Sequence, residues 1–146
     1  MNEPRLIGGG IHVDDRGETV FVNAFDFRDV KRFYTIANHR SGTVRAWHGH
    51  KREAKYVSAV RGAFLVCCVK IDDWEGPSKE LHIHRFVLAE HSPAVLYIPA
   101  GHANGLMSLA DDAKAIVFST ATLQESATDD FRFPARMWDA WSIEER

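Results

Sequence analysis

Residues 42–62 read Gly-Thr-Val-Arg-Ala-Trp-His-Gly-His-Lys-Arg-Glu-Ala-Lys-Tyr-Val-Ser-Ala-Val-Arg-Gly, two strand-forming runs with a polar stretch between them. The runs lie near residues 43–47 and 54–60 and contain β-branched and aromatic residues that favour strands. Two histidines, His48 and His50, follow the first run, and Lys55 lies in the second. This segment predicts two consecutive strands whose connection carries imidazole and charged side chains.

The same pattern continues towards both ends of the chain. Short runs of this kind lie near residues 18–23, 31–37, 43–47, 54–60, 63–71, 81–88, 94–98, 105–109 and 113–120. The breaks between them are rich in Gly, Pro, Asp and Ser, which are typical of turns. Closely spaced short strands without helical periodicity predict an all-β fold, either a β-sandwich or a jelly-roll barrel.

The length of 146 residues fits one domain, residues 1–146, because two substantial cores need a longer chain. Only the last stretch, residues 129–146, departs from the strand pattern. It contains Phe131, Trp138 and Trp141, and we expect a short segment, helical or extended, that forms either a helix over one barrel mouth or an exposed interface.

Composition excludes several classes of protein. The formal net charge of −2 lacks the basic excess that binds a phosphate backbone. No apolar run approaches the ~18 residues that span a bilayer, and the N-terminus starts no signal-peptide pattern. Cys67 and Cys68 are adjacent in an apolar run, so a strand sends their side chains to opposite faces. We expect a soluble cytoplasmic protein without disulfides, membrane contact or nucleic-acid partner.

The His48-x-His50 pair is the first candidate for chemistry. Residues at i and i+2 share one face of a strand. If that face lines the barrel interior near Lys55, burial and mutual repulsion lower the imidazole pKa values, and the pair can exchange protons near pH 7. The alternative is a solvated hairpin in which both histidines face water.

Gly42, five residues, His48-x-His50 and a closing Gly62, followed by Pro99-Ala-Gly101, resemble the motifs of the cupin superfamily of jelly-roll barrels. Cupin metal sites usually add a glutamate and a third histidine. Those two positions fall on Lys55 and Asn104, and a lysine would repel a divalent ion. The resemblance therefore implies a cupin-type jelly roll without a metal, with a makeshift site of His48, His50 and His102 as the alternative.

A closer resemblance covers both ends and the middle of the chain. Asp15-Arg16-Gly17, the run from Asn38 to His48, Lys55, and Ile98 to Gly105 are similar to motifs of the dTDP-4-dehydrorhamnose 3,5-epimerase group. That group has a catalytic tyrosine in the strand that corresponds to residues 113–123, where this chain has none. Its C-terminal aspartate also lacks an in-register counterpart, since Asp129, Asp130 and Asp139 are displaced from the pattern.

Other residues resemble a sister group, the dTDP-4-keto-6-deoxyglucose 3,4-ketoisomerases. Val30 to Tyr34 and Arg45 to Lys51 are similar to its motifs, in which an Arg-x-x-His-Ala-His-Lys run supplies two working histidines. This resemblance implies a metal-independent and cofactor-free isomerase, a 3,4-ketoisomerase or C3/C5-epimerase, of a nucleotide-linked 4-keto-deoxy sugar. Such enzymes serve deoxysugar or cell-surface polysaccharide biosynthesis. The alternatives are a non-catalytic sugar-binding cupin and a metal-dependent cupin enzyme.

The two resemblances assign roles to particular side chains. Catalytic roles fall on His48, His50 and Lys55, and substrate-binding roles on Arg16, Arg45, His102 and Asn104. In the expected chemistry His48 removes the C3 proton, Lys55 or Arg45 stabilises the enediolate, and His50 delivers a proton to C4. A homodimer is expected to form through the alternating stretch 18–23, with Arg16 carried towards the partner's pocket.

Strand periodicity assigns different roles to the remaining candidates. Trp47 alternates with His48 and is expected in a core. Arg45 lies two residues before Trp47 and therefore shares its face, opposite to His48. It reaches the face of His48 only if a β-bulge redirects its side chain. His82 and His84 form a second His-x-His pair on a strand that we expect to be half-exposed. His12, His39 and His91 lie in turn contexts and are expected at the surface.

Overall fold

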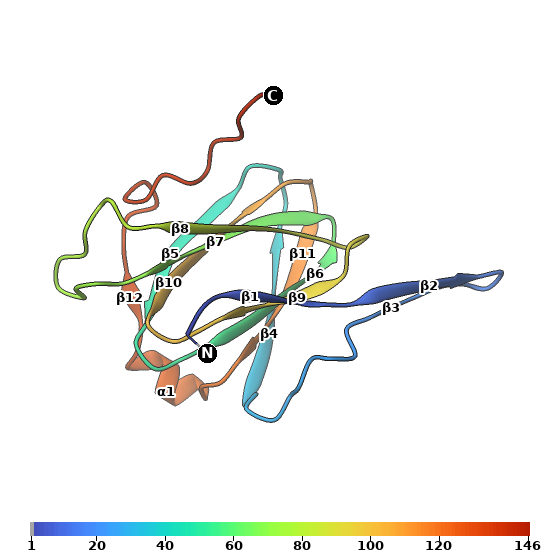
Figure 1. Ribbon diagram of the computed structural model, residues 1–146, viewed down its shortest axis with the longest axis horizontal. Coiled ribbons are helices and arrows are strands. Elements are labelled where there is room, and N and C mark those ends of the chain that lie inside the picture. Colours follow the sequence, from blue (N-terminus) through green and yellow to red (C-terminus); the bar gives the residue numbers. More distant parts are fainter. Residues whose placement is uncertain (1) are drawn as a thin grey trace.

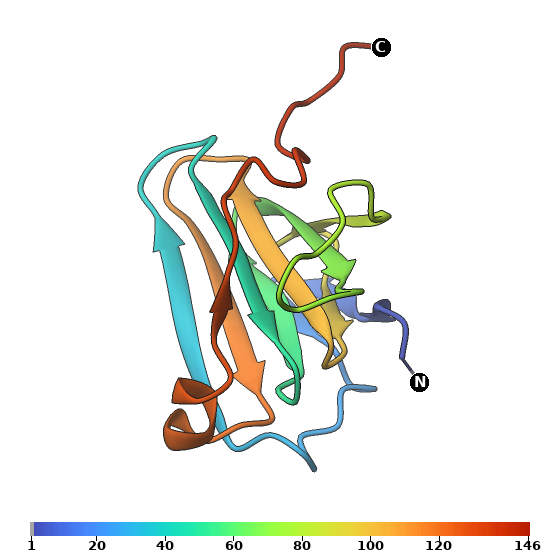
Figure 2. The same cartoon turned by 90° about the vertical axis from the view of Figure 1, so that its left-hand side faces the viewer.

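The computed structural model describes residues 2–146, and it consists mainly of two five-stranded antiparallel sheets packed face to face (Figures 1 and 2). The elements are β1 (Arg5–Gly8), β2 (Gly10–Asp14), β3 (Gly17–Phe21), β4 (Arg32–Asn38), β5 (Val44–His50), β6 (Lys55–Arg61), β7 (Ala63–Lys70), β8 (Ile83–Ala89), β9 (Ala94–Ile98), β10 (His102–Ser108), β11 (Ala113–Ser119), α1 (Leu123–Ala127) and β12 (Phe131–Arg132). The expected jelly-roll architecture is confirmed.

Strand order explains how distant segments meet. The first sheet runs β1-β9-β6-β11-β4 and the second β12-β5-β10-β7-β8. The inner faces enclose a core that contains Val57, Phe64, Leu96 and Val117. Figure 2 shows β4 and β5 on the same side of the molecule, where the edges of the two sheets lie close together. The polar pocket described below lies between these strands.

The C-terminal stretch has a different role from the two that were expected. It is extended after β12, and Trp138 and Trp141 are almost fully buried against the outer face of the second sheet. There they pack with Trp47, which is fully buried, and with Cys67. The expected extended conformation is confirmed. The expectations of a helix over a barrel mouth and of an exposed interface are wrong, because the outward-facing side chains of this sheet are apolar and need cover.

The nine expected strands are present, with bounds shifted by a few residues. Cys67 and Cys68 lie in the outer and inner cores respectively, as alternation predicts. The short strands β1, β2 and β12 and the helix α1 were not expected. Glycines interrupt the run that contains β1 and β2, and β12 has only two residues, so neither shows a strand-length apolar run. Among the described residues, no helix has the length and apolar character to span a bilayer.

The hairpin β2–β3 projects from the body of the molecule (Figure 1). Its side chains Val13 and Val20 are 68% and 48% exposed. Arg16 lies in its turn and is also exposed, with its guanidinium bound to the carboxylate of Asp14 at 2.6 Å. The hairpin therefore presents apolar and charged groups away from its own barrel.

Candidate active site

A pocket of about 450 Å³ lies between β4 of the first sheet and β5 of the second. Its lining includes five residues that the sequence singles out: Arg45, His48, His50, Lys55 and Asn104. The motif residues therefore gather in one cavity. The alternative of a solvated hairpin is wrong, because His50 is 4% exposed and Lys55 is 9% exposed.

The register of β10 against β5 sets the floor of the pocket. Asn104 pairs with His48 and His102 with His50, while Leu106 pairs with Arg45. Three steps along β5 thus oppose two steps along β10, which is a β-bulge on β5. Regular alternation would put Arg45 and His48 on opposite faces of β5, and the bulge brings them onto the same face. Arg45 Nε donates a hydrogen bond to Asn38 Oδ1 at 2.8 Å.

His48 has a lowered pKa. Burial and the positive charges of Arg132 and Lys55 lower its pKa from 6.5 to about 4. The imidazole is therefore neutral at pH 7 and has a lone pair that can accept a proton. The amide of Asn104 donates to the backbone carbonyl of His48 at 3.2 Å, and this contact ties the base to β10.

His50 presents one defined nitrogen to the pocket. Its Nδ1 lies 2.7 Å from the carbonyl oxygen of Asp129 and 3.5 Å from Oε1 of Glu53. Both neighbours are acceptors, so Nδ1 carries the hydrogen in the neutral ring. Nε2 is buried without a hydrogen-bond partner. Burial and Lys55 lower the pKa of His50, so Nε2 is a free proton acceptor near neutral pH.

Tyr34 is a pocket residue that the sequence analysis did not single out. It lies on β4, and its ring faces two cations, with Arg32 at 5.2 Å and Lys55 Nζ at 5.8 Å from the ring centre. It pairs directly with Val117 of β11, in the strand where no tyrosine was found. The alternation of side chains along a strand over residues 32–38, which puts Tyr34 on the same face as Ile36, was the sequence signal that could have placed Tyr34 on the inner face.

Two aspartates after α1 also support the pocket. Asp129 is 1% exposed, and its carboxylate accepts hydrogen bonds from the backbone N–H groups of Lys51, Arg52 and Glu53. Asp130 lines the pocket, and its charge raises the pKa of His48. Although these aspartates are out of register with the resembling motif, Asp129 and Asp130 lie beside the histidines, because the turn before β6 and the segment after α1 fold against each other.

The pocket is rich in fixed positive charge. Besides Arg45 and Lys55 it contains Arg32 and Arg132, neither of which was expected. Arg132 forms a bidentate pair with Asp130, and Arg32 reaches to 3.6 Å from the buried Glu53. Guanidinium groups bind phosphate oxygens with two parallel hydrogen bonds, so this lining suits a diphosphate.

Four expected or considered residues lie outside the pocket. Arg16 is on the projecting hairpin, beside a separate shallow hollow. His102 is buried, with Nδ1 3.2 Å from the carbonyl oxygen of Ala100 and its ring beside His84. His84 is half-buried and His82 exposed, in keeping with a half-exposed strand. Within one chain, Arg45 and Asn104 line the pocket, whereas Arg16 and His102 lie elsewhere.

The donor set does not fit a metal site of the cupin type. Within residues 2–146, no three His, Cys, Asp or Glu side chains come together in a way that could hold a metal ion. Lys55 occupies the pocket where a carboxylate ligand would be needed, and its ammonium is a cation itself. The side chains present are acid–base and anion-binding groups.

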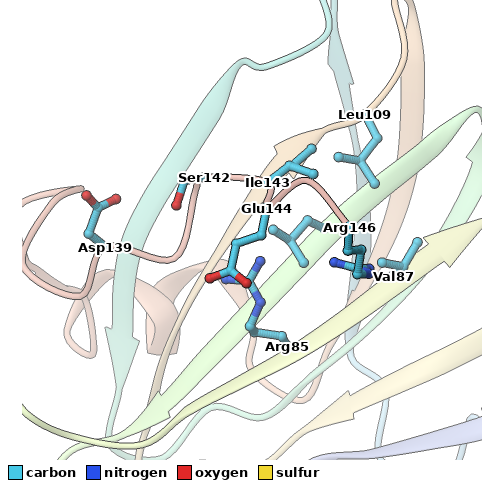
Figure 3. A pocket seen from close by; sticks show the side chains of 9 residues that line it. Arg85, Val87, Leu109, Asp139, Ser142, Ile143, Glu144 and Arg146 are labelled. Carbon is cyan, nitrogen blue, oxygen red and sulfur yellow. The ribbon is translucent and has the colours of Figure 1, made fainter.

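A second and larger hollow, of about 560 Å³, lies between the C-terminal segment and the outer face of β7 and β8. Figure 3 shows its polar lining of Arg85, Glu144 and Arg146 around the apolar side chains of Val87 and Ile143. It contains no histidine, cysteine or tyrosine, so it lacks groups that exchange protons near pH 7. The smaller pocket is therefore the candidate active site.

Comparisons with known proteins show what the chain is similar to. The family model described as dTDP-4-dehydrorhamnose 3,5-epimerase matches residues 6–134. A search of curated proteins finds no significant match. Among solved structures, the epimerase of Sulfolobus tokodaii has 23% identity and a TM-score of 0.76, covering 97% of this chain and 82% of that one.

Two further solved structures show how widely this fold is shared. An epimerase of Mycobacterium tuberculosis has 23% identity and a TM-score of 0.74, covering 89% of this chain and 68% of that one. A 3,4-ketoisomerase of Helicobacter canadensis has 14% identity and a TM-score of 0.69, covering 94% and 96%. Both kinds of enzyme are thus built on the fold described above.

Proposed function

The chain belongs to the dTDP-4-dehydrorhamnose 3,5-epimerase family, and from this premise and the pocket geometry we propose that it is a metal-independent 3,4-ketoisomerase of a nucleotide-linked 4-keto-deoxy sugar. The observation that carries the proposal is the pair of neighbouring imidazoles, of which His50 offers a buried and unpartnered Nε2. Epimerisation at C3 needs one base and one acid on opposite faces. Ketoisomerisation also needs a group that moves a hydroxyl proton between neighbouring oxygens.

The first step uses His48. A carbonyl at C4 acidifies the hydrogen on C3, and a neutral imidazole accepts that proton. The electrons form an enediolate whose negative charge lies on the C4 oxygen. Lys55 and Arg45 are the pocket cations that stabilise this oxygen.

The second step uses His50 and Tyr34. Nε2 of His50 accepts the proton of the C3 hydroxyl and returns it to the C4 oxygen, while the Tyr34 hydroxyl gives a proton to C4. The C3–H and O3–H bonds break, the C4–H and O4–H bonds form, and the ketone moves to C3. The proton taken by His48 restores the Tyr34 hydroxyl through solvent, so the enzyme ends the cycle unchanged.

Binding uses the remaining cations. The diphosphate would lie against Arg32 and Arg132, which leaves Arg45 and Lys55 to the enediolate oxygen. Asn104 replaces a histidine of the family motif with a neutral amide and so adds no third base. Such an isomerase would act in the cytoplasm on the way to deoxysugars of cell-surface polysaccharide.

Solvent exchange tests the proposal directly. A panel of dTDP-linked 4-keto sugars is incubated with the enzyme in D₂O, and NMR locates the deuterium and the ketone. We expect the label at C3 of recovered substrate and a 3-keto product. The same result is expected after treatment with a chelator, because the pocket has a lysine where a metal ligand would be needed.

Three other outcomes would contradict this function. Label at C3 or C5 with inverted configuration and no 3-keto product would identify an epimerase. Binding of the nucleotide sugar without any label would identify a non-catalytic sugar-binding protein. If the purified protein contains a stoichiometric metal, and turnover is lost when the metal is removed and regained when it is added back, the protein is a metal-dependent enzyme.

We also propose a homodimer. The outer face of the first sheet carries a cluster that we call the aromatic face: Phe25, Phe27, Phe33, Tyr56 and Phe118. Phe27 is 58% and Phe33 is 65% exposed. Exposed aromatic clusters of this kind are typical of interfaces. A second copy that covers this face with its β2–β3 hairpin would place its Arg16 near the pocket edge at β4.

Light scattering checks the dimer. We expect a particle of twice the chain mass of 16.5 kDa at micromolar concentration. Val20→Glu, on the hairpin, should shift the particle towards the monomer because it places a charge in an apolar contact. Val87→Glu is the matched control, since Val87 is 61% exposed on the other sheet. A monomer in the unaltered protein would count against the proposal.

A further inference from the structure

Glu53 is a buried carboxylate beside the pocket. It lies in the turn between β5 and β6, and its side chain is fully buried. The hydroxyls of Ser119 and Ser126 donate to its two oxygens, with Ser126 Oγ 2.8 Å from Oε1. Burial of a charge is costly unless partners compensate it, and a serine pair of this kind keeps the group in one orientation.

The same carboxylate touches two parts of the proposed machinery. Its Oε1 lies 3.5 Å from Nδ1 of His50, and its Oε2 lies 3.6 Å from Nη2 of Arg32. Arg32 in turn lies over the ring of Tyr34 at 5.2 Å. The buried carboxylate of Glu53 therefore lies between His50, the proposed proton relay, and Arg32. Arg32 packs on the ring of Tyr34, the proposed acid.

We propose that Glu53 is a positioning residue that holds His50 in its Nδ1–H form and stabilises the protonated imidazole during the relay. The inference rests on the proposed function for its catalytic meaning, while its effect on the His50 ring stands independently of any substrate. Asp129 fixes the Nδ1–H bond through its carbonyl oxygen. Glu53 adds the negative charge that a carbonyl lacks.

Other groups also act on the His50 ring. The charged or titratable groups that face it from neighbouring elements are Lys55, His48, Asp129, Asp130 and His102. Burial and Lys55 lower the pKa of His50, whereas the hydrogen bond to Asp129 and the charge of Glu53 raise it. Removal of the Glu53 charge should therefore lower this pKa further.

The test is ¹⁵N NMR of the histidine rings in the substrate-free full-length protein, with the His50 signals assigned by their loss in His50→Asn. In the unaltered protein we expect the Nδ1–H tautomer. Glu53→Gln keeps the shape of the side chain and removes the charge, so the His50 pKa should fall by about one unit or more, the usual effect of a lost opposite charge at this distance. Glu75→Gln, in the loop after β7, is the matched control and should leave it unchanged.

A second variant gives the opposite sign. Ser126→Ala removes a hydrogen bond from Oε1, the oxygen that faces His50, and leaves the charge in place. The unshared charge should then raise the His50 pKa. This result keeps the proposal testable even if Glu53→Gln does not fold.

Catalysis provides the last measurement. Glu53→Gln should lower kcat for the 3-keto product about tenfold, change KM little and leave C3 exchange by His48 in place, because a relay base contributes only part of general acid–base catalysis. An unchanged His50 pKa and tautomer in both variants, with only a lower Tm, would show a purely structural role and overturn the inference. A shifted ring in an enzyme that makes no 3-keto product from any sugar would refute the proposed function and retain the positioning role.

Discussion

His48→Asn should reduce solvent exchange at C3 and product formation together, by ~10²- to 10⁴-fold, the usual contribution of a positioned general base. Asparagine roughly preserves volume and a hydrogen bond but cannot accept the C3 proton. KM should change little, because in the proposed binding mode the diphosphate is held by Arg32 and Arg132 and not by His48. Two rates are measured in the variant and in the unaltered protein: the rate at which deuterium enters C3 and the rate at which the 3-keto product forms.

The pH dependence of the unaltered enzyme provides a second check on His48. Its pKa of about 4 means that the neutral base dominates above that value, so exchange should stay level as the pH falls from 8 and decline only as it approaches 4. His91→Asn, at an exposed histidine outside the pocket, is the matched control and should keep normal rates. Near-normal exchange in His48→Asn would place the base elsewhere and refute the assignment of the pocket.

The strands of the barrel follow from local pattern, because a run of β-branched and aromatic residues between turn residues has few other solutions. The role of the C-terminal stretch does not. Trp138 and Trp141 are apolar wherever they lie, and only the folded chain shows that the outer face of the second sheet, with Trp47 and Cys67, is apolar as well and faces them. The packing partner of an apolar segment cannot be predicted from its own sequence, because the partner surface is formed by residues far away in the chain.

The candidate site divides in a similar way. His48, His50 and Lys55 lie within eight residues of one another, so sequence spacing and resemblance suffice to group them. Tyr34 and Asp130 join them only through β-sheet pairing and the fold of the segment after α1. The strand β11, where the resemblance leads one to expect an acid, contains no tyrosine. The structure has a tyrosine on the neighbouring strand, directly beside Val117.

That displacement alters the chemistry that the pocket favours. Tyr34, the proposed acid, lies on β4, which faces β5 across the pocket, and it lines the pocket together with both histidines. The bulge at Arg45 brings a cation to the same face. The proposed base and relay thus come from β5, the proposed acid from β4, and the cations from β5 and β6. What distinguishes ketoisomerisation from epimerisation in this pocket is the role of His50.

His50→Asn should separate C3 exchange from ketone transfer. Under ketoisomerisation the first proton still leaves to His48, so deuterium enters C3 at a near-normal rate. The C3 hydroxyl proton then has no imidazole Nε2 to carry it to the C4 oxygen, and formation of the 3-keto product should fall by ~10²-fold or more, as for other lost acid–base groups. Both rates are read from one NMR time course in D₂O with the 4-keto nucleotide sugar.

His82→Asn is the matched control for this variant, because His82 is an exposed histidine outside the pocket and should leave both rates unchanged. The unaltered and substituted proteins should also bind dTDP equally well, since the proposed diphosphate contacts are with Arg32 and Arg132 and not with His50. If exchange and ketone transfer fall together in His50→Asn, the ring takes part in removal of the C3 proton. If neither falls, the free Nε2 of His50 has no part in the reaction, and the pocket would then support simple epimerisation with Tyr34 as the acid on the opposite face.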